Sequence, residues 1–247
     1  MSDQLIYLVM TGLNAVQDKM TASNNNLANV ATTAYKAQRP AFQALPFYGQ
    51  GVPSRADVAT LEEQPDFKAG AIQNTGRPLD VVVNGPGWIG VQAADGTPAY
   101  TRNGSLQIST AGVLETSGGQ PVLGEDGNPI TLPALGQVSI GADGTVSGVP
   151  QGQTADQPVV YGRISLANPA PDTMTRRPDG LFQSSGGPTN TGDPVTLQSG
   201  ALETSNVSAV GVMVDMIKQT RMFQTQTELL HTMSSLGQGA SSPLSLQ

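Results

Sequence analysis

Residues 3–30 read DQLIYLVMTGLNAVQDKMTASNNNLANV, and this stretch decides how we expect the chain to fold. Its apolar residues recur at alternating steps of three and four, which places them along one side of an α-helix. The residues on this seam are Ile6, Val9, Leu13, Val16, Met20, Leu27 and Val30, with Ser23 in the same register. The pattern predicts a helix over residues 1–31 that meets another helix of the same chain or of a neighbour.

The far end of the chain carries a matching pattern. Met216, Phe223 and Leu230 are seven residues apart, Ala209, Met213, Thr220 and Thr227 lie on the same seam, and Val210 and Ile217 lie beside it. This spacing predicts a second helix over residues 201–236, which Gly237 ends, and residues 237–247 are expected to be a flexible tail. Apolar side chains cover more than half of the circumference of this helix, so we expect it to contact more than one partner.

Helix-breaking residues are confined to the interior of the chain. All prolines except Pro243 lie between Pro40 and Pro194, and nearly all glycines lie between Gly49 and Gly200. Residues 32–75 are expected to form an extended connecting segment. In residues 76–200, short apolar runs alternate with turn signals, which predicts antiparallel β structure. The turn signals are Asn84-Gly85, Asp95-Gly96, Asn103-Gly104, Asp126-Gly127 and Asp143-Gly144.

These patterns together predict an α+β fold. Long N- and C-terminal helices are expected to form a coiled-coil-like domain, and an antiparallel β domain, a barrel or a sandwich, is inserted between them. Such a layout is typical of proteins that assemble.

Composition and charge exclude several functional classes. The formal net charge is −7 and basic residues are scattered, which argues against nucleic-acid binding. There is no cysteine, which excludes disulfides and thiolate chemistry. No apolar run approaches the length of a membrane span, and the first residues do not resemble a cleavable secretory signal. We therefore expect export, if it occurs, to use another route.

The inventory of reactive residues also argues against an enzyme. The single histidine, His231, is expected on a solvated helix face, so no histidine cluster exists for a metal ion. The acidic residues Glu62, Glu63 and Asp66 lie in a segment bounded by proline and are expected to be solvated rather than catalytic. We predict no catalytic residue, no metal, no cofactor and no small-molecule substrate.

Several motifs resemble those of a known family. NNLANVATTAYK at residues 25–36 resembles the N-terminal signature of the bacterial flagellar rod and hook proteins, and LETSNV at residues 202–207 resembles their C-terminal signature. Interior motifs agree, namely TGRPLDV at 75–81, GPGW at 85–88 and YTRNGSL at 100–106. The signature residues are Asn25, Asn26, Leu27, Ala28, Asn29, Tyr35, Ser205, Asn206 and Val207. The sequence departs from the family at Ala34, where glycine is usual.

The resemblance implies a structural subunit of the flagellar basal-body rod, the shaft that crosses the periplasm and transmits motor torque. YGRISLANP at 161–169 and RRPDGLF at 176–182 look most like the proximal rod members. The implied partners are proximal and distal rod proteins, further copies of this chain and, during secretion without a cleaved signal, the flagellar type III export apparatus. Helical assembly through the terminal helices is implied, with the seam residues as the interface.

Two alternatives stay open. Within the family, the chain could be a distal rod or hook-type protein. From another class, a secreted β-rich carbohydrate-binding module or enzyme would need a concave cluster of aromatic or carboxylate side chains, whereas aromatic residues here make up only 4% and are dispersed.

Overall fold

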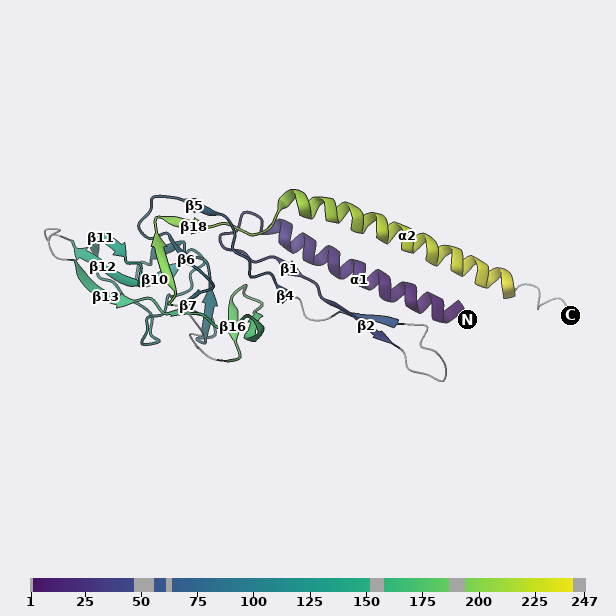
Figure 1. Ribbon diagram of the computed structural model, residues 1–247, viewed down its shortest axis with the longest axis horizontal. Coiled ribbons are helices and arrows are strands. Elements are labelled where there is room, and N and C mark those ends of the chain that lie inside the picture. The colour runs from purple at the N-terminus through teal and green to yellow at the C-terminus, as the bar shows by residue number, and fades with distance from the viewer. Residues whose placement is uncertain (1, 47–55, 61–63, 152–157, 187–193, 242–247) are drawn as a thin grey trace. The chain divides into compact units, whose positions relative to one another are not determined.

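The chain divides into two compact units, each described here by itself. The computed structural model describes residues 2–46, 56–60, 64–151, 158–186 and 194–241 (Figure 1). Unit 1 joins residues 1–30, 37–66 and 207–247, and unit 2 joins residues 31–36 and 67–206. Each unit therefore combines segments that are far apart in the sequence.

The described residues of unit 1 form two helices and four short strands. They are α1 (Ser2–Ala28), β1 (Gln38–Arg39), β2 (Phe42–Pro46), β3 (Ala56–Thr60), β4 (Gln64–Pro65) and α2 (Ala209–Ser241). Helices α1 and α2 lie side by side and run in opposite directions (Figure 1). Strands β2 and β3 pair antiparallel, as do β1 and β4. Helix α1 also packs on β1 and β3, so α2 covers only one of its sides.

The face of α2 that packs on α1 carries polar residues between the apolar residues of the predicted seam. Gln219 Nε2 donates a hydrogen bond to Ser23 Oγ over 3.0 Å, and the side chain of Gln226 lies against Gly12. By contrast, Met213 and Phe223 of the predicted seam are exposed. The contact between the helices is therefore lined in part by amides, a hydroxyl and a glycine rather than by an unbroken apolar row.

The predicted fold class is wrong for this reason. The described residues form eighteen strands and only two α-helices, so most of the elements are strands. The helices do not form a separate coiled-coil-like domain: unit 1 includes four strands as well, and Gln219 and Gln226 interrupt the apolar row at the contact of the helices. The inserted β-rich part was predicted correctly. Neither α1 nor α2, over the residues described, combines the length and apolarity needed to cross a bilayer.

Unit 2 is built from fourteen short strands and a 3-10 turn among its described residues. The elements are β5 (Ile72–Asn74), β6 (Val81–Asn84), β7 (Trp88–Gln92), β8 (Pro98–Thr101), β9 (Leu106–Ile108), β10 (Leu114–Thr116), β11 (Leu135–Ile140), β12 (Thr145–Pro150), β13 (Val159–Arg163), β14 (Leu166–Ala167), η1 (Pro171–Thr173), β15 (Met174–Arg176), β16 (Phe182–Ser184), β17 (Thr196–Ser199) and β18 (Ala201–Glu203).

The strands of unit 2 belong to five antiparallel sheets. The largest has the order β14-β7-β8-β16-β15, the next is β11-β12-β13, and the pairs β5–β18, β6–β17 and β9–β10 complete the set. These sheets enclose one core of aliphatic side chains, and Ile89, Leu106 and Leu114 at its centre are fully buried. A separate aromatic cluster contains Trp88, Tyr100 and Phe182.

Most of the predicted turns are present because glycine supplies a positive φ. Gly85, Gly96, Gly127 and Gly144 all have φ between 78° and 85°. Asn103-Gly104 differs, since the flanking strands β8 and β9 pair with other strands and form no hairpin. Gly104 is needed for a different reason, because a Cβ there would lie 1.8 Å from the carbonyl oxygen of Val81, and only glycine permits this close approach.

The element boundaries also differ from those expected. Strands β1 to β5 lie within residues 32–75, which we predicted to be a connecting segment. Helix α2 begins at Ala209 because residues 201–203 form β18, and it continues to Ser241, past Gly237. Residues 242–247 of the predicted tail lie outside the described residues. The division into functional domains at the predicted boundaries stays a prediction.

Candidate functional site

A buried carboxylate in unit 2 gathers residues from three of the sequence motifs. Glu203 Oε1 accepts a hydrogen bond from Lys36 Nζ over 2.6 Å, and Glu203 Oε2 accepts one from Arg102 Nη1 over 3.1 Å. Lys36 is fully buried, and the side chains of Arg102 and Glu203 are 4% and 3% exposed. We call these three residues the charge hub. Lys36 belongs to the N-terminal motif, Arg102 to an interior motif and Glu203 to the C-terminal motif.

Backbone groups complete the polar contacts of the charge hub. Gly70 N donates to Glu203 Oε1 over 2.7 Å, and Lys36 Nζ donates to the carbonyl oxygen of Lys68 over 2.9 Å. Arg102 donates through Nε to Gly87 O and through Nη2 to Gly85 O. Buried ions need such partners, because desolvation otherwise costs more than the ion pair returns. The hub holds two cations and one anion, so its stability depends on Glu203.

The chain segments on either side of the hub are bonded to each other within unit 2. Ala34 N donates to Glu203 O over 2.8 Å, and Asn206 N donates to Tyr35 O over 3.2 Å. Asn206 Nδ2 also donates to Lys68 O over 3.0 Å. The segment that follows α1 in sequence is thus fastened to the segment that precedes α2.

Ala34 adopts the left-handed conformation in this segment. Its φ is 55°, and it is the only residue other than glycine with a positive φ among those described. The side chain is buried, and the backbone N–H is held by Glu203. Ala34 thus has a backbone conformation that glycine adopts without strain and that alanine adopts at a steric cost.

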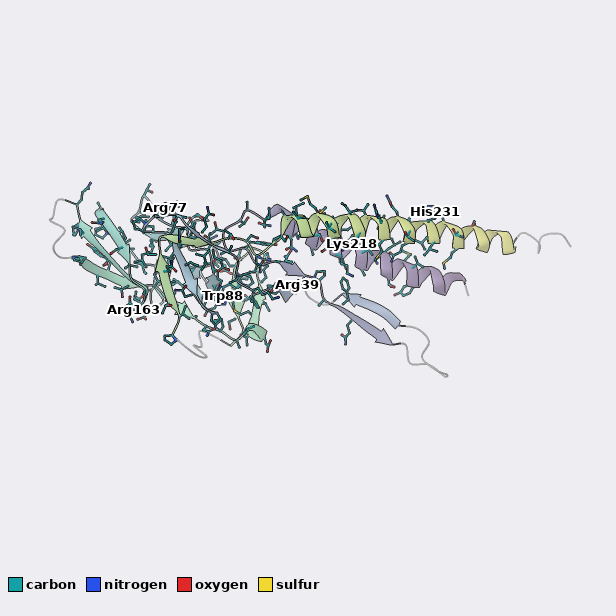
Figure 2. All side chains as sticks on the ribbon, turned by 45° about the horizontal axis from the view of Figure 1, so that its top comes forward. Arg39, Arg77, Trp88, Arg163, Lys218 and His231 are labelled. Carbon is teal, nitrogen blue, oxygen red and sulfur yellow. The ribbon has the colours of Figure 1, made fainter. Side chains whose placement is uncertain are left out.

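Aromatic packing supports the same region. The rings of Phe67, Trp88 and Phe182 meet with centroid separations of 4.7 to 5.8 Å, and Trp88 lies among the crowded side chains of unit 2 (Figure 2). The Arg102 guanidinium lies 5.6 Å from the centroid of the Trp88 ring. The Arg176 guanidinium lies 4.5 Å from the centroid of the Tyr35 ring. The two arginines thus connect the aromatic cluster to the segments around the hub by cation–π contacts.

The charge hub has no geometry for catalysis. Both oxygens of Glu203 are engaged and buried, so they cannot accept a proton from a substrate. His231 is exposed on α2 (Figure 2). Glu62 and Glu63 lie outside the described residues, and Asp66 pairs with Arg39 over 2.6 Å. Within the described ranges, no three histidine or acidic side chains gather so that they could hold a metal ion.

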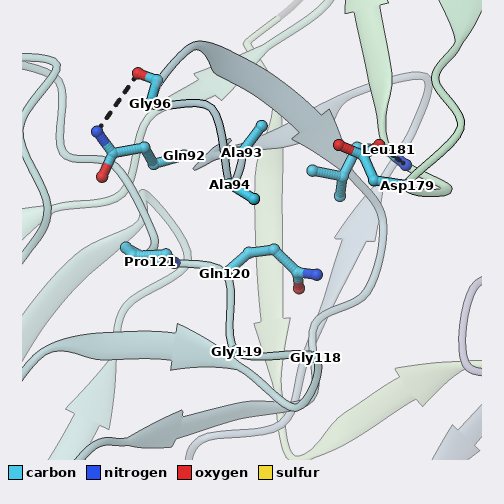
Figure 3. A pocket seen from close by; sticks show the side chains of 10 residues that line it. All are labelled: Gln92, Ala93, Ala94, Gly96, Gly118, Gly119, Gln120, Pro121, Asp179 and Leu181. Carbon is cyan, nitrogen blue, oxygen red and sulfur yellow. Dashed lines mark hydrogen bonds between the residues drawn. The ribbon is translucent and has the colours of Figure 1, made fainter.

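A surface pocket in unit 2 is equally unsuited to chemistry. It measures about 400 Å³ and is lined by Gln92, Gln120, Asp179 and Leu181, together with the glycine and alanine backbone between them (Figure 3). Gln92 Nε2 donates to Gly96 O, and Asp179 accepts from Arg177 and from the backbone N–H of Leu181. Its polar groups are therefore occupied by contacts within the loops.

Two carboxyl groups of unit 2 have lowered pKa values because they accept hydrogen bonds within turns and from nearby arginines. The pKa of Asp95 is held well below its usual value by a hydrogen bond from Arg177 and by further bonds from Thr97. Hydrogen bonds from the Thr145 hydroxyl and backbone, and then from Arg163, lower the pKa of Asp143 to about 2. A general acid or base near neutral pH would need a raised pKa, so these groups are structural.

The predicted interface residues separate into two sets. Val16 is buried, and Val9, Leu13, Met20, Leu27, Val30, Met216 and Leu230 are half-buried. Met213, Ile217 and Phe223 of α2 are exposed, with Ile217 56% accessible. The side chain of Ile6 lies outside the described residues. The prediction did not list Val210 and Val214, which are 70% and 44% exposed on the same helix.

The signature residues have local structural roles. Asn26 is buried and bonds Gln38 twice, through Nδ2 to its carbonyl oxygen and through Oδ1 to its N–H. Asn29 Nδ2 donates to the carbonyl oxygen of Asn25 near the end of α1. Leu27 is half-buried, Ala28 is exposed, and Ser205 and Val207 are half-buried between β18 and α2. Lys36, Arg102 and Glu203 lie within the quoted motifs, but no sequence pattern distinguishes these three residues from their neighbours.

Comparison with known proteins agrees with these motifs. Residues 82–148 match the model of the flagellar hook protein FlgE/F/G D1 domain, and residues 198–242 match that of the flagellar basal body rod FlgEFG protein C-terminal region. The chain is 36% identical over 251 residues to the flagellar basal-body rod protein FlgF of Escherichia coli K12, covering 99% of both chains. It belongs to the flagellar basal-body rod protein family.

Other relatives have similar coverage. The FlgF protein of Salmonella typhimurium is 37% identical over 235 residues, which is 92% of this chain and 93% of the relative. The flagellar basal-body rod protein FlgG of Bacillus subtilis is 31% identical over 251 residues, with 92% and 94% covered. The recognition of this family from the sequence motifs is thus confirmed.

Proposed function

We propose that this rod-family protein is a FlgF-like structural subunit of the proximal flagellar rod and has no enzymatic role. The family membership and the near full-length similarity to FlgF proteins support the structural assignment. The single observation that supports a mode of assembly is the exposed apolar surface of α2. We propose that this surface binds neighbouring rod subunits.

The exposed surface lies near the start of α2. We call Val210, Met213, Val214 and Ile217 the apolar stripe, because they recur at steps of three and four and are 44% to 70% exposed. Phe223, 40% exposed, follows further along the helix. Contiguous exposed apolar side chains on a protein surface mark an interaction site. Burying one such side chain fully contributes about 1.5–3 kcal/mol, so burial of all four would supply a substantial part of the free energy of association.

The other predicted interface residues take a different part in this proposal. Val16 is buried inside unit 1, so it stabilises the subunit and does not touch a neighbour. The half-buried residues Leu13, Met216 and Leu230 also stabilise the subunit, through the part of each side chain that is covered. The assembly contacts are proposed for Met213, Ile217 and Phe223, joined by Val210 and Val214.

The remaining features of the proposal follow from the family. The partners are other proximal and distal rod proteins and further copies of this chain, and the flagellar type III export apparatus carries the chain outward without removal of a signal. The site of action is the basal body, where the rod spans the periplasm. Recovery of the intact N-terminal residues in basal bodies would support the export route, and loss of the first twenty or so would contradict it.

The assembly surface can be tested by complementation. In a strain that lacks the gene, Ile217→Asp and Phe223→Asp each place a carboxylate in a contact where it has no partner. Both variants should be made and should keep unit 2 folded, but they should not enter basal bodies or restore swimming. Gln17→Asp is the matched control, since Gln17 is exposed and belongs to α1, whereas the stripe belongs to α2. Normal swimming with both variants incorporated would contradict the proposed surface.

A further inference from the structure

The contact between α1 and α2 contains two glutamines whose side-chain carbonyl oxygens accept no hydrogen bond from any described residue. Gln219 and Gln226 are one heptad apart on α2 and face α1. Gln219 donates to Ser23, yet its Oε1 is buried without a hydrogen-bond partner in the described structure. Oε1 of Gln226 is likewise buried and unbonded within the described residues. A buried polar atom without a partner is destabilising, so its presence calls for a physical reason.

Helix α1 provides a matching recess for each glutamine. Ser23 is buried and offers its hydroxyl to Gln219. Gly12 offers space: a Cβ at this position would lie 3.2 Å from Gln226 Nε2, which is tighter than an ordinary contact. A larger side chain at position 12 would therefore displace Gln226 or the helix that carries it.

Other alignments of the helices lack these recesses. Because the helices are antiparallel, a shift of one turn moves Gln226 from Gly12 to Val16 or Leu8, and moves Gln219 away from Ser23. Each shift replaces the glycine opposite Gln226 by an aliphatic residue, whereas the present alignment gives one glutamine a hydroxyl and the other a recess. A polar residue in an otherwise apolar helix contact can specify alignment at a cost in stability.

We propose that Gln219 and Gln226, with Ser23 and Gly12, fix the register of α2 on α1. The glutamines act as positioning residues: the register decides where the apolar stripe lies along α1. This last consequence rests on the proposed function, whereas the register itself does not. Val210 and Ile217 lie on the helix that carries both glutamines, so a slipped α2 would present the stripe displaced by about 5 Å for each turn.

The register can be measured directly in the full-length protein. Since the chain has no cysteine, Asn24→Cys and Thr225→Cys allow two spin labels to be attached at exposed positions of α1 and α2. These positions are offset along the helix axes, so a slip of one turn changes their separation. In the parent, double electron–electron resonance should show one narrow distribution of the distance between the two labels. The double variant Gln219→Leu/Gln226→Leu should add a second component displaced by about 5 Å.

Two further variants separate register from fold. Gly12→Leu should shift the distance, because the introduced leucine side chain would occupy the space of Gln226, while Gln17→Leu, at an exposed position of α1, should leave it unchanged. All variants should keep the fluorescence of buried Trp88, which reports unit 2. An unchanged single distance in the double variant, or a broad distribution in the parent, would overturn the register proposal. Swimming by the strain that lacks the gene would instead overturn the proposed function.

Discussion

Glu203 is the residue whose change should disturb unit 2 most. Its carboxylate accepts from Lys36 over 2.6 Å, from Gly70 over 2.7 Å and from Arg102 over 3.1 Å. Glu203→Gln keeps the shape but removes the charge, so Lys36 and Arg102 both lose the carboxylate that they share. Breaking a buried ion pair in this way costs about 3–5 kcal/mol. For a unit of this size, that loss lowers the melting temperature by roughly 6–20 °C.

Trp88 makes the experiment specific to unit 2. It is the single tryptophan of the chain, it is 4% exposed, and its ring lies 5.6 Å from the Arg102 guanidinium. Urea unfolding of the full-length protein followed by its fluorescence therefore reports the unit that contains the charge hub. The free energy of unfolding from this transition should fall by about 3–5 kcal/mol in Glu203→Gln.

Two controls define the cause. Lys36→Met removes one of the two cations and leaves Glu203 paired with Arg102, so it should cost less than Glu203→Gln. Glu125→Gln makes the same chemical change in an exposed pair with Arg163, and its transition should match that of the parent. A loss in Glu203→Gln no larger than in Glu125→Gln, or a larger loss in Lys36→Met, would refute the reasoning.

Three further predictions concern unit 2. Ala34→Gly should raise the free energy of unfolding by about 1 kcal/mol in the same urea assay, because glycine adopts the φ of 55° without steric cost; a lower value would count against a strained turn. Gly104→Ala should lower it by about 1–3 kcal/mol, since the new Cβ would meet the Val81 carbonyl oxygen, and an unchanged midpoint would contradict that close approach. The pKa of Asp143 is lowered from 3.8 to about 2, so the stability that its ionised form contributes is present above the unfolded pKa of 3.8 and is lost as the pH falls toward 2. Thr145→Ala should raise the pKa of Asp143 in a carboxyl NMR titration. An unchanged pKa would show that the Thr145 hydroxyl is not the main cause of the shift.

Local features of the fold could be predicted from the sequence. Asp95-Gly96, Asp126-Gly127 and Asp143-Gly144 each form the expected turn, because the need for a positive φ is decided within a few residues. The confinement of proline and glycine to the interior likewise identified the β-rich part. Asn103-Gly104 carries a similar turn signal, but the strands on either side of it form no hairpin. Its glycine is required instead by the close approach of Val81, 23 residues earlier in the chain.

Features that depend on distant residues could not be predicted in this way. The charge hub joins Lys36, Arg102 and Glu203, which are separated by 66 and 101 residues, and no periodicity connects them. The polar contacts of α2 were missed for a related reason. Gln219 and Gln226 alternate with Met216, Phe223 and Leu230 at steps of three and four, but the partners Ser23 and Gly12 lie on α1, far away in the sequence.

Electron cryomicroscopy of purified basal bodies would show whether this chain is a subunit of the rod. The map of the proximal rod should contain subunits into which unit 2 fits, with side-chain density for Trp88 and the charge hub. In the same map, the apolar stripe of α2 should contact a neighbouring subunit. A complete proximal rod in which every subunit is a different protein would contradict the assignment of this chain to the rod.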